Sequence, residues 1–274
     1  MNRLIYLVQG RSDLVEGYFH LAERENADAL FLTYDKKIEN AIFFPNSKWS
    51  EGRNKLLEHA KKRGQYDYYI FCDDDIKFRK GSWDEFERLL LKYKPAIGHP
   101  LFIPKAKLTP LPFFESQVFC IIDQQLVAYH KDLVSDGVIL PYQHQHDEYS
   151  WWISGSIANL IIRNFYSRST LQFNNIVVLN TETGRYDGTN NKNSHKYSID
   201  WFGKECNNGF KRFIRKKKEI TPVLKLKLAI SSAIYQLVER NSSSSYKIER
   251  SNFSKFFKND SVFLKQYDEF NPKN

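Results

Sequence analysis

The stretch that decides the fold is Asp67-Tyr68-Tyr69-Ile70-Phe71-Cys72-Asp73-Asp74-Asp75-Ile76, in which an apolar run ends abruptly in three consecutive carboxylates. A short apolar run rich in aromatic residues is typical of a buried strand in a parallel sheet, and ligands bind beyond the carboxyl ends of such strands. Because adjacent carboxylates repel one another, their position indicates a bound cation; a solvated acidic turn is the alternative. Oxygen ligands of this kind favour Mg²⁺ or Mn²⁺, which usually arrive with a phosphate-bearing substrate.

Strands and helices alternate around this stretch up to about residue 130. We expect strands over 3–8, 29–33, 41–44, 68–72, 117–122, 126–129 and 175–179. Helices are expected after Ser12, from Ser47 to a stop at Gly64, from the capping box at Ser82 to about Tyr93, over Asp147–Phe165 and over 223–238. This alternation predicts an α/β fold with a Rossmann-like, mostly parallel sheet flanked by helices.

The positive charge of the chain is concentrated near its C-terminus. Of the net +9, residues 211–250 supply +8, with 11 Lys or Arg against 3 Glu, and residues 251–274 supply +1, so residues 1–210 are neutral. We therefore expect a domain over 1–210 and a basic helical C-terminal extension over 211–274. A localised basic segment that also contains apolar residues fits an anionic membrane surface better than a nucleic acid, so we expect peripheral membrane contact through 211–240 and no nucleic-acid partner. The alternative for 223–238 is an ordinary helix packed on the first domain with its lysines exposed.

The lack of a recognisable secretory signal and the spacing of the cysteines predict a cytoplasmic protein. The apolar segment 4–8 is too short for a secretory signal, and no apolar run is long enough to cross a bilayer. Cys72, Cys120 and Cys206 are widely spaced and odd in number, which indicates thiols and no disulfide framework. We expect a cytoplasmic protein that can work at the inner face of the membrane.

Polar groups from four segments are expected at the same edge of the sheet: Gln9-Gly10-Arg11, Tyr34-Asp35, the helix start after Pro45, and Asp73-Asp74-Asp75. A nucleotide bound across this edge has a use for each of them. Asp35 can accept from ribose hydroxyls or a base N–H, and a helix N-terminus with Arg53 nearby can hold phosphate. The alternative for Arg53 is an exposed helix residue.

The first 200 residues resemble a GT-A-type glycosyltransferase, the nucleotide-diphospho-sugar transferase fold. The resemblance rests on the βαβ opening, on the helix with Glu51-Gly52-Arg53-Asn54, and on Phe71-Cys72-Asp73-Asp74-Asp75, which is similar to the Asp-x-Asp motif of that family. It implies that Asp73 contacts ribose or the metal, that Asp75 binds a Mn²⁺ or Mg²⁺ ion bridging the diphosphate, and that Asp74 shares either duty. It also implies a late His as a further metal ligand, for which His195 is the candidate and an exposed loop His the alternative.

A second cluster is His144-Gln145-His146-Asp147-Glu148-Tyr149-Ser150-Trp151-Trp152. Indole rings such as those of Trp151 and Trp152 can stack on sugars, and a carboxylate can remove a proton from an acceptor hydroxyl. We expect Asp147 to be this base, with Glu148 as the second candidate; a helix-capping Asp147 followed by buried tryptophans is the alternative. A His-x-His-x-Asp zinc site is disfavoured because Asp147 directly follows His146.

These observations predict a metal-dependent, inverting glycosyltransferase that uses a nucleotide-sugar donor and a glycan or lipid-linked acceptor. The resemblance places it in bacterial surface polysaccharide biosynthesis. A sugar nucleotidyltransferase is one alternative, but Gln9-Gly10-Arg11-Ser12 has a single Gly where those enzymes usually carry a Gly-rich loop. A non-enzymatic module for anionic polymers is the other, and the neutral residues 1–210 argue against it.

Overall fold

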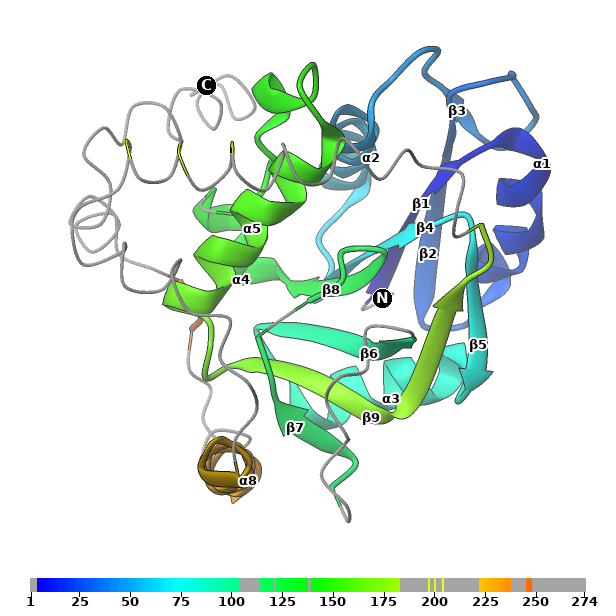
Figure 1. The fold of residues 1–274 in the computed structure, drawn as a ribbon. Coiled ribbons are helices and arrows are strands. Elements are labelled where there is room, and N and C mark those ends of the chain that lie inside the picture. The colour runs from blue at the N-terminus through cyan, green and yellow to red at the C-terminus, as the bar shows by residue number, and fades with distance from the viewer. Residues whose placement is uncertain are drawn as a thin grey trace.

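In the described part of the chain, nine strands and the helices beside them make up the fold (Figure 1). The computed structural model describes residues 4–103, residues 114–182 without 121 and 138, positions 197, 200 and 204, and residues 222–237 and 245–247. The strands are β1 (Leu4–Gly10), β2 (Ala27–Thr33), β3 (Ile42–Phe43), β4 (Tyr68–Asp73), β5 (Ile76–Lys80), β6 (Ile97–Ile103), β7 (Ser116–Val118), β8 (Leu126–His130) and β9 (Thr170–Asn180). The helices are α1 (Ser12–Val15), η1 (Glu16–Glu23), α2 (Trp49–Arg63), α3 (Trp83–Tyr93), α4 (Lys131–Asp136), η2 (His144–His146), α5 (Trp151–Phe165) and α8 (Pro222–Leu237).

All of these strands belong to one mixed sheet with the order β3-β2-β1-β4-β8-β6-β9-β5, in which β7 also pairs with β9. Strands β3, β2, β1 and β4 are parallel, and β8 runs against both β4 and β6. Strand β9 is parallel to β6, whereas β5 and β7 run against β9. Six strands therefore share one direction and three oppose it, which confirms the predicted α/β fold with a mostly parallel sheet.

The sheet separates two hydrophobic cores because successive side chains of each strand point to opposite faces. In β1, Ile5 and Leu7 face the core that is covered by α2, α4 and α5. Leu4, Tyr6 and Val8 face the other core, which η1, α3 and α8 cover. The apolar run of β4 is shared between the two cores in the same way, so the sequence pattern of a strand buried on both faces is confirmed.

The elements around the two acidic clusters differ from the sequence prediction. The acidic turn is followed at once by β5, whose apolar and charged residues alternate as Ile76, Lys77 and Phe78, and which pairs with the distant β9. The helix expected over Asp147–Phe165 begins only at Trp151, so the prediction that Asp147 opens a helix is wrong. The preceding residues form the short turn η2 instead.

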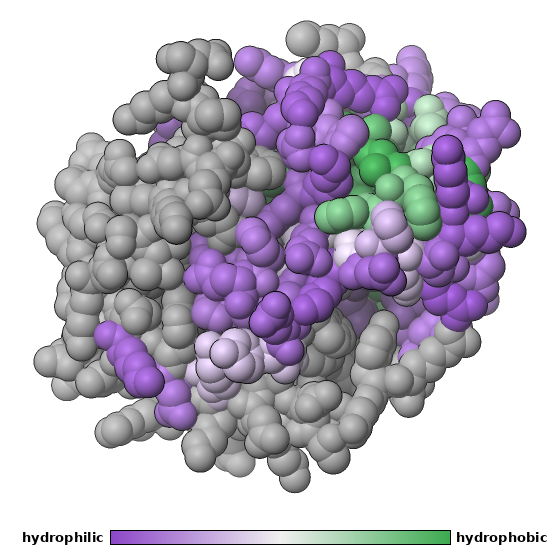
Figure 2. Space-filling view, turned by 90° about the horizontal axis from the view of Figure 1, so that it is seen from above, coloured by the Kyte–Doolittle hydropathy of each residue, from purple (hydrophilic) through white to green (hydrophobic). Residues whose placement is uncertain are grey.

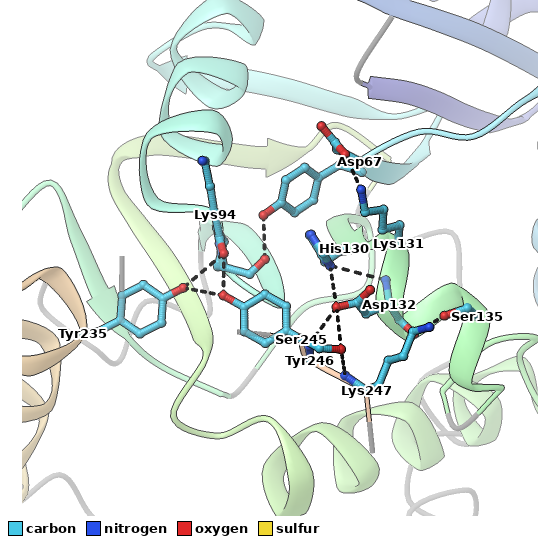
Figure 3. Close-up of polar contacts among 12 residues, drawn as sticks. Asp67, Lys94, His130, Lys131, Asp132, Ser135, Tyr235, Ser245, Tyr246 and Lys247 are labelled. Atoms are coloured by element: carbon cyan, nitrogen blue, oxygen red, sulfur yellow. Dashed lines mark hydrogen bonds and ion pairs between the residues drawn. The ribbon is translucent and has the colours of Figure 1, made fainter. Parts of the chain in front are cut away.

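The described C-terminal segments pack on the body of the molecule (Figure 3). Lys94 ends α3 in the left-handed conformation, with φ 46°. Its carbonyl accepts hydrogen bonds from the hydroxyls of Tyr235 at 3.3 Å and Tyr246 at 2.5 Å. Asp132 accepts from the backbone N–H of Tyr246 at 2.8 Å. Tyr235 lies on α8, so this helix is fixed against the sheet domain, and the boundary at residue 210 stays a prediction.

Among the helices in the described part of the chain, none combines the length and the apolar character needed to cross a bilayer. Cys72 is buried and Cys120 half-buried, and both are free thiols, as expected; Cys206 lies outside the described residues.

Candidate functional site

The carboxyl ends of β1, β2 and β4 meet at one edge of the sheet. Gln9 is opposite Asp73, and Gly10 is opposite Thr33. This edge lies toward the upper right of Figure 1, and Figure 2 looks onto the molecule from above, where an apolar patch is bordered by hydrophilic residues. The predicted convergence of Gln9-Gly10-Arg11, Tyr34-Asp35, the start of α2 and the acidic turn is confirmed by the hydrogen bonds between them.

Gly10 is needed because the carboxyl group of Asp74 occupies the space beside it. A Cβ atom at position 10 would lie 2.0 Å from Cγ of Asp74, which is closer than any real contact. In this position Asp74 accepts a hydrogen bond from the backbone N–H of Arg11 at 2.6 Å. The acidic turn is therefore locked to the end of β1 by a contact that only glycine permits.

Asp35 joins the end of β2 to the start of α1. Its two carboxylate oxygens accept from the backbone N–H of Ser12 at 2.9 Å and from the Ser12 hydroxyl at 3.0 Å. Burial acts to raise the pKa of Asp35, but these hydrogen bonds outweigh it and lower the pKa. Asp35 stays exposed at the edge of the sheet, and Tyr34 and Phe43 nearby in the chain are exposed aromatic residues.

Gln9 keeps a buried acceptor beside the first turn of α2. Its Nε2 donates to the carbonyl of Trp49 at 2.9 Å, while its buried Oε1 has no hydrogen-bond partner among the described residues. Oε1 would lie only 2.5 Å from a Cβ at position 52, so Gly52 at the first turn of α2 makes room for it.

Arg53 is enclosed beside Asp73 at the end of β4. Its side chain is 0% exposed, and its guanidinium donates to Oδ1 of Asp73 at 2.6 Å while lying 4.1 Å from the centre of the Trp49 ring. Burial acts to lower the pKa of Arg53, but the charge of Asp73 outweighs it and raises the pKa, so Arg53 stays charged. Because the guanidinium is enclosed, the structure does not support chelation of phosphate by Arg53. The alternative that Arg53 is an exposed helix residue is wrong. Arg53 positions Asp73.

The other two carboxylates of the turn, Asp74 and Asp75, lie where burial and like charges disfavour their ionised form. Burial, together with the charges of neighbouring carboxylates, raises the pKa of Asp74 to about 7 and that of Asp75 to about 6. Oδ1 of Asp75 is buried and has no hydrogen-bond partner among the described residues. The backbone N–H of Thr181 donates to the carbonyl of Asp75 at 2.9 Å, so the C-terminal end of β9 lies beside this turn.

These oxygen donors fit a hard divalent cation in part. Asp75 offers an unpartnered carboxylate oxygen, and Asp73 has Oδ2 outside its bonds to Arg53 and Trp49. Mg²⁺ is usually bound through one or two carboxylates plus substrate phosphates, which matches this pair. The described residues contain no group of three or more His, Cys, Asp or Glu side chains that could hold a metal alone. The predicted ligand His195 lies outside the described residues.

Asp147 contacts both α2 and α5, and its partner Ser50 in α2 lies 97 residues away in the sequence. One carboxylate oxygen accepts from the hydroxyl of Ser50 near the start of α2, and the other accepts from the hydroxyl of Ser154 in α5 at 2.9 Å. Asp147 is buried, and burial raises its pKa against the effect of these serines. Because both oxygens are engaged, this carboxylate has the character of a structural link. Glu148, next along the chain, is exposed.

An aromatic group lies beside these acids. The rings of Tyr149 and Tyr197 stack at 5.1 Å with 23° between their planes, and His146 meets Tyr197 edge-on at 5.8 Å. Burial lowers the pKa of His146 to about 4, so its ring is neutral at neutral pH. Tyr197 follows β9 in the sequence. Trp151 and Trp152 begin α5, and their side chains lie outside the described residues.

Sequence reasoning missed Trp49, Ser50 and Tyr142, which surround the acids. The indole of Trp49 donates to Asp73 at 3.2 Å, and the Tyr142 hydroxyl accepts from Arg53 at 3.3 Å. A usable signal was present for Trp49 and Ser50, since they open the helix that contains the predicted Arg53. No local pattern marks Tyr142, which approaches from 89 residues away.

No family model and no curated protein matches the sequence. Solved structures that match include S. aureus TarS 1–349 in complex with UDP-GlcNAc, with a TM-score of 0.47 and 10% identity over 98% of this chain and 80% of that one. A putative nucleotide-diphospho-sugar transferase from Desulfovibrio desulfuricans matches with a TM-score of 0.41 and 12% identity, over 86% and 99% of the two chains. A CMP:2-keto-3-deoxy-manno-octonic acid synthetase complexed with CTP matches with a TM-score of 0.39 and 13% identity, over 73% and 98%.

Proposed function

We propose that this chain is a glycosyltransferase that moves a sugar from a nucleoside-diphosphate donor to an acceptor hydroxyl. The observation that carries the proposal is the acidic turn after β4, where Asp75 keeps a buried oxygen without a hydrogen-bond partner among the described residues. Such a group is stabilised when a cation binds beside it, and burial together with neighbouring carboxylates raises the pKa values of Asp74 and Asp75 in the same turn.

The donor would lie across the ends of β1, β2 and β4. Asp75 and Oδ2 of Asp73 would hold Mn²⁺ or Mg²⁺, which supplies stabilisation of the negative charge that develops on the leaving diphosphate. The unpartnered Oε1 of Gln9 and the carboxylate of Asp35 supply acceptors for N–H or hydroxyl groups of the nucleoside. The exposed ring of Tyr34 offers a face for the base.

The acceptor would approach from the side of η2 and α5. Asp147 is enclosed by Ser50 and Ser154, whereas the exposed Glu148 can reach an incoming hydroxyl. We therefore assign the base to Glu148 and a positioning role to Asp147, reversing the order of the two candidates. A direct attack assisted by this base inverts the anomeric centre. Trp151 and Trp152 stay candidates for stacking on a glycan or lipid-linked acceptor of the bacterial surface.

Product analysis tests the reaction. Purified protein is incubated with a panel of nucleotide sugars in Mn²⁺ or in EDTA, with Asp75→Asn and the surface variant Glu25→Gln in parallel. Release of a nucleoside diphosphate that requires Mn²⁺ and is lost only in Asp75→Asn supports glycosyl transfer or donor hydrolysis. Release of pyrophosphate from a nucleoside triphosphate and a sugar phosphate would instead identify a nucleotidyltransferase.

A further inference from the structure

Helix α8 carries an apolar stripe on its outer face. Leu226, Ile230 and Ile234 are 62%, 52% and 50% exposed. They are spaced four residues apart, so at about 100° per residue they lie within a sector of about 80° on one side of the helix. Large apolar side chains gathered in this way differ from the single exposed apolar residues that most surfaces carry.

The opposite side of α8 is fixed to the sheet domain, so the stripe cannot turn inward. Ser232 is buried, and its hydroxyl accepts a hydrogen bond from the backbone N–H of Val118 in β7 at 2.9 Å. Tyr235 is buried too, and its hydroxyl donates to the carbonyls of Tyr93 and Lys94. At about 100° per residue these two residues lie on the far side of the helix from Ile230. The hydrogen bond from Tyr235 to the carbonyl of Lys94 is visible in Figure 3.

The charge near the stripe distinguishes between two possible partners, a second copy of the chain and a lipid surface. Residues 211–250 carry a net +8, and the exposed Lys227 lies directly beside Leu226. A second copy of the chain would bring the same positive charge against itself, which opposes pairing. An anionic lipid surface attracts it, with each Lys or Arg near the surface adding to the binding.

We infer that the stripe of Leu226, Ile230 and Ile234 is a docking surface for an anionic lipid bilayer. Helix α8 would lie in the plane of the interface, with these three side chains among the acyl chains and the basic residues at the headgroups. The helix seen end-on at the lower left of Figure 1 is well separated from the ends of β1 and β4, so docking leaves the sheet edge open. This inference does not depend on the proposed reaction.

Vesicle sedimentation tests the inference with the full chain. The probes are phosphatidylcholine vesicles with and without about one third phosphatidylglycerol. We compare the wild-type chain with Leu226→Gln/Ile230→Gln/Ile234→Gln and with Ser231→Gln, an exposed polar position on the same helix. Thermal unfolding of each variant establishes that it is folded, which is expected because the changed side chains are exposed.

The wild type and Ser231→Gln should bind the anionic vesicles and not the neutral ones, and the triple variant should bind more than about tenfold more weakly. Lys227→Gln should weaken binding to a smaller extent, most clearly at low salt. Equal binding by the folded triple variant, or no binding by the wild type, would overturn the inference. A wild-type dimer in sedimentation that the triple variant abolishes would instead assign the stripe to a second copy.

Discussion

Position 10 is where a single atom decides the geometry of the acidic turn. Replacing Gly10 by Ala places Cβ in the space of the Asp74 carboxyl, so the turn must move away from β1 and the hydrogen bond to Arg11 is lost. We expect Gly10→Ala to lower the free energy of unfolding by about 1–3 kcal/mol, from overpacking and the unmet N–H. Chemical denaturation measures this value. Gly17→Ala is the matched control, because a Cβ there meets nothing within 4 Å and should change stability by less than about 0.5 kcal/mol.

Asp147 and Glu148 are neighbours with opposite expected phenotypes. Asp147→Ala leaves the buried hydroxyl of Ser50 without its acceptor, which should cost about 1–3 kcal/mol of stability. The hydroxyl of Ser154 keeps the carbonyl of Gln143 as an acceptor at 2.5 Å. Glu148→Ala removes an exposed side chain and should leave stability within about 0.5 kcal/mol, while lowering kcat on the order of 10²–10⁴-fold if it is the base. Denaturation and sugar-transfer assays on both variants separate the two roles. Normal turnover in Glu148→Ala would contradict the assignment.

At the scale of elements, α2 is tied to β4 by the ion pair between Arg53 and Asp73. Arg53→Met removes the partner of Asp73 and should destabilise the protein by about 3–5 kcal/mol, because an ion pair is broken from one side. The double variant Arg53→Met/Asp73→Asn should recover a large part of that loss, since no unpaired charge remains. A double-mutant cycle in denaturant measures the coupling. Additive effects of the two single changes would show that the pair does not hold the helix.

The contact between α3 and the residue preceding β7 predicts a pH dependence. Glu115 receives hydrogen bonds from Lys92, Tyr93 and Arg88, and the bond from Lys92 contributes most to lowering the pKa of Glu115 to about 2. A carboxylate whose pKa falls on folding stabilises the native state above its ordinary pKa of 4.5, and this stabilisation is lost as the pH falls toward 2.

Glu115→Gln should therefore flatten the fall in stability between pH 4.5 and 2, as measured by denaturation at several pH values. The effect is expected to be modest, because Glu115 is partly exposed and solvent screens its charge. Glu25→Gln, at the surface, serves as the comparison and should leave the slope unchanged. An identical slope in Glu115→Gln would show that this contact does not contribute to acid sensitivity.

At the scale of the whole molecule, local patterns predicted the fold and long-range pairing decided the site. The apolar run 68–72 placed the acidic turn at a strand end, and the turn residues after β1 and β2 were expected at the same edge. Those features follow from periodicity and from the rule for parallel sheets. The sequence could also predict that 223–238 forms a helix, which the structure places at Pro222–Leu237.

Contacts between distant residues were beyond prediction. Whether Arg53 meets phosphate or Asp73 depends on how α2 rotates against β4, and no local pattern records that rotation. The partner of Asp147, Ser50, lies 97 residues away, so no local pattern around Asp147 marks the contact. In sequence, a carboxylate that caps a helix therefore looks the same as one that makes a tertiary link. The strand β5 was missed because it follows the acids without a break and is completed only by pairing with β9.

Calorimetric titration tests directly whether the acidic turn binds a nucleotide through a divalent cation. Nucleoside diphosphates with each common base are titrated into wild type and Asp75→Asn, in Mn²⁺ and in EDTA, with Glu25→Gln as a folded control. We expect one nucleotide to bind the wild type and the control only in Mn²⁺, with affinity reduced at least about tenfold in Asp75→Asn. Binding of equal strength in EDTA, or in Asp75→Asn, would contradict it, as would the absence of nucleotide binding under every condition.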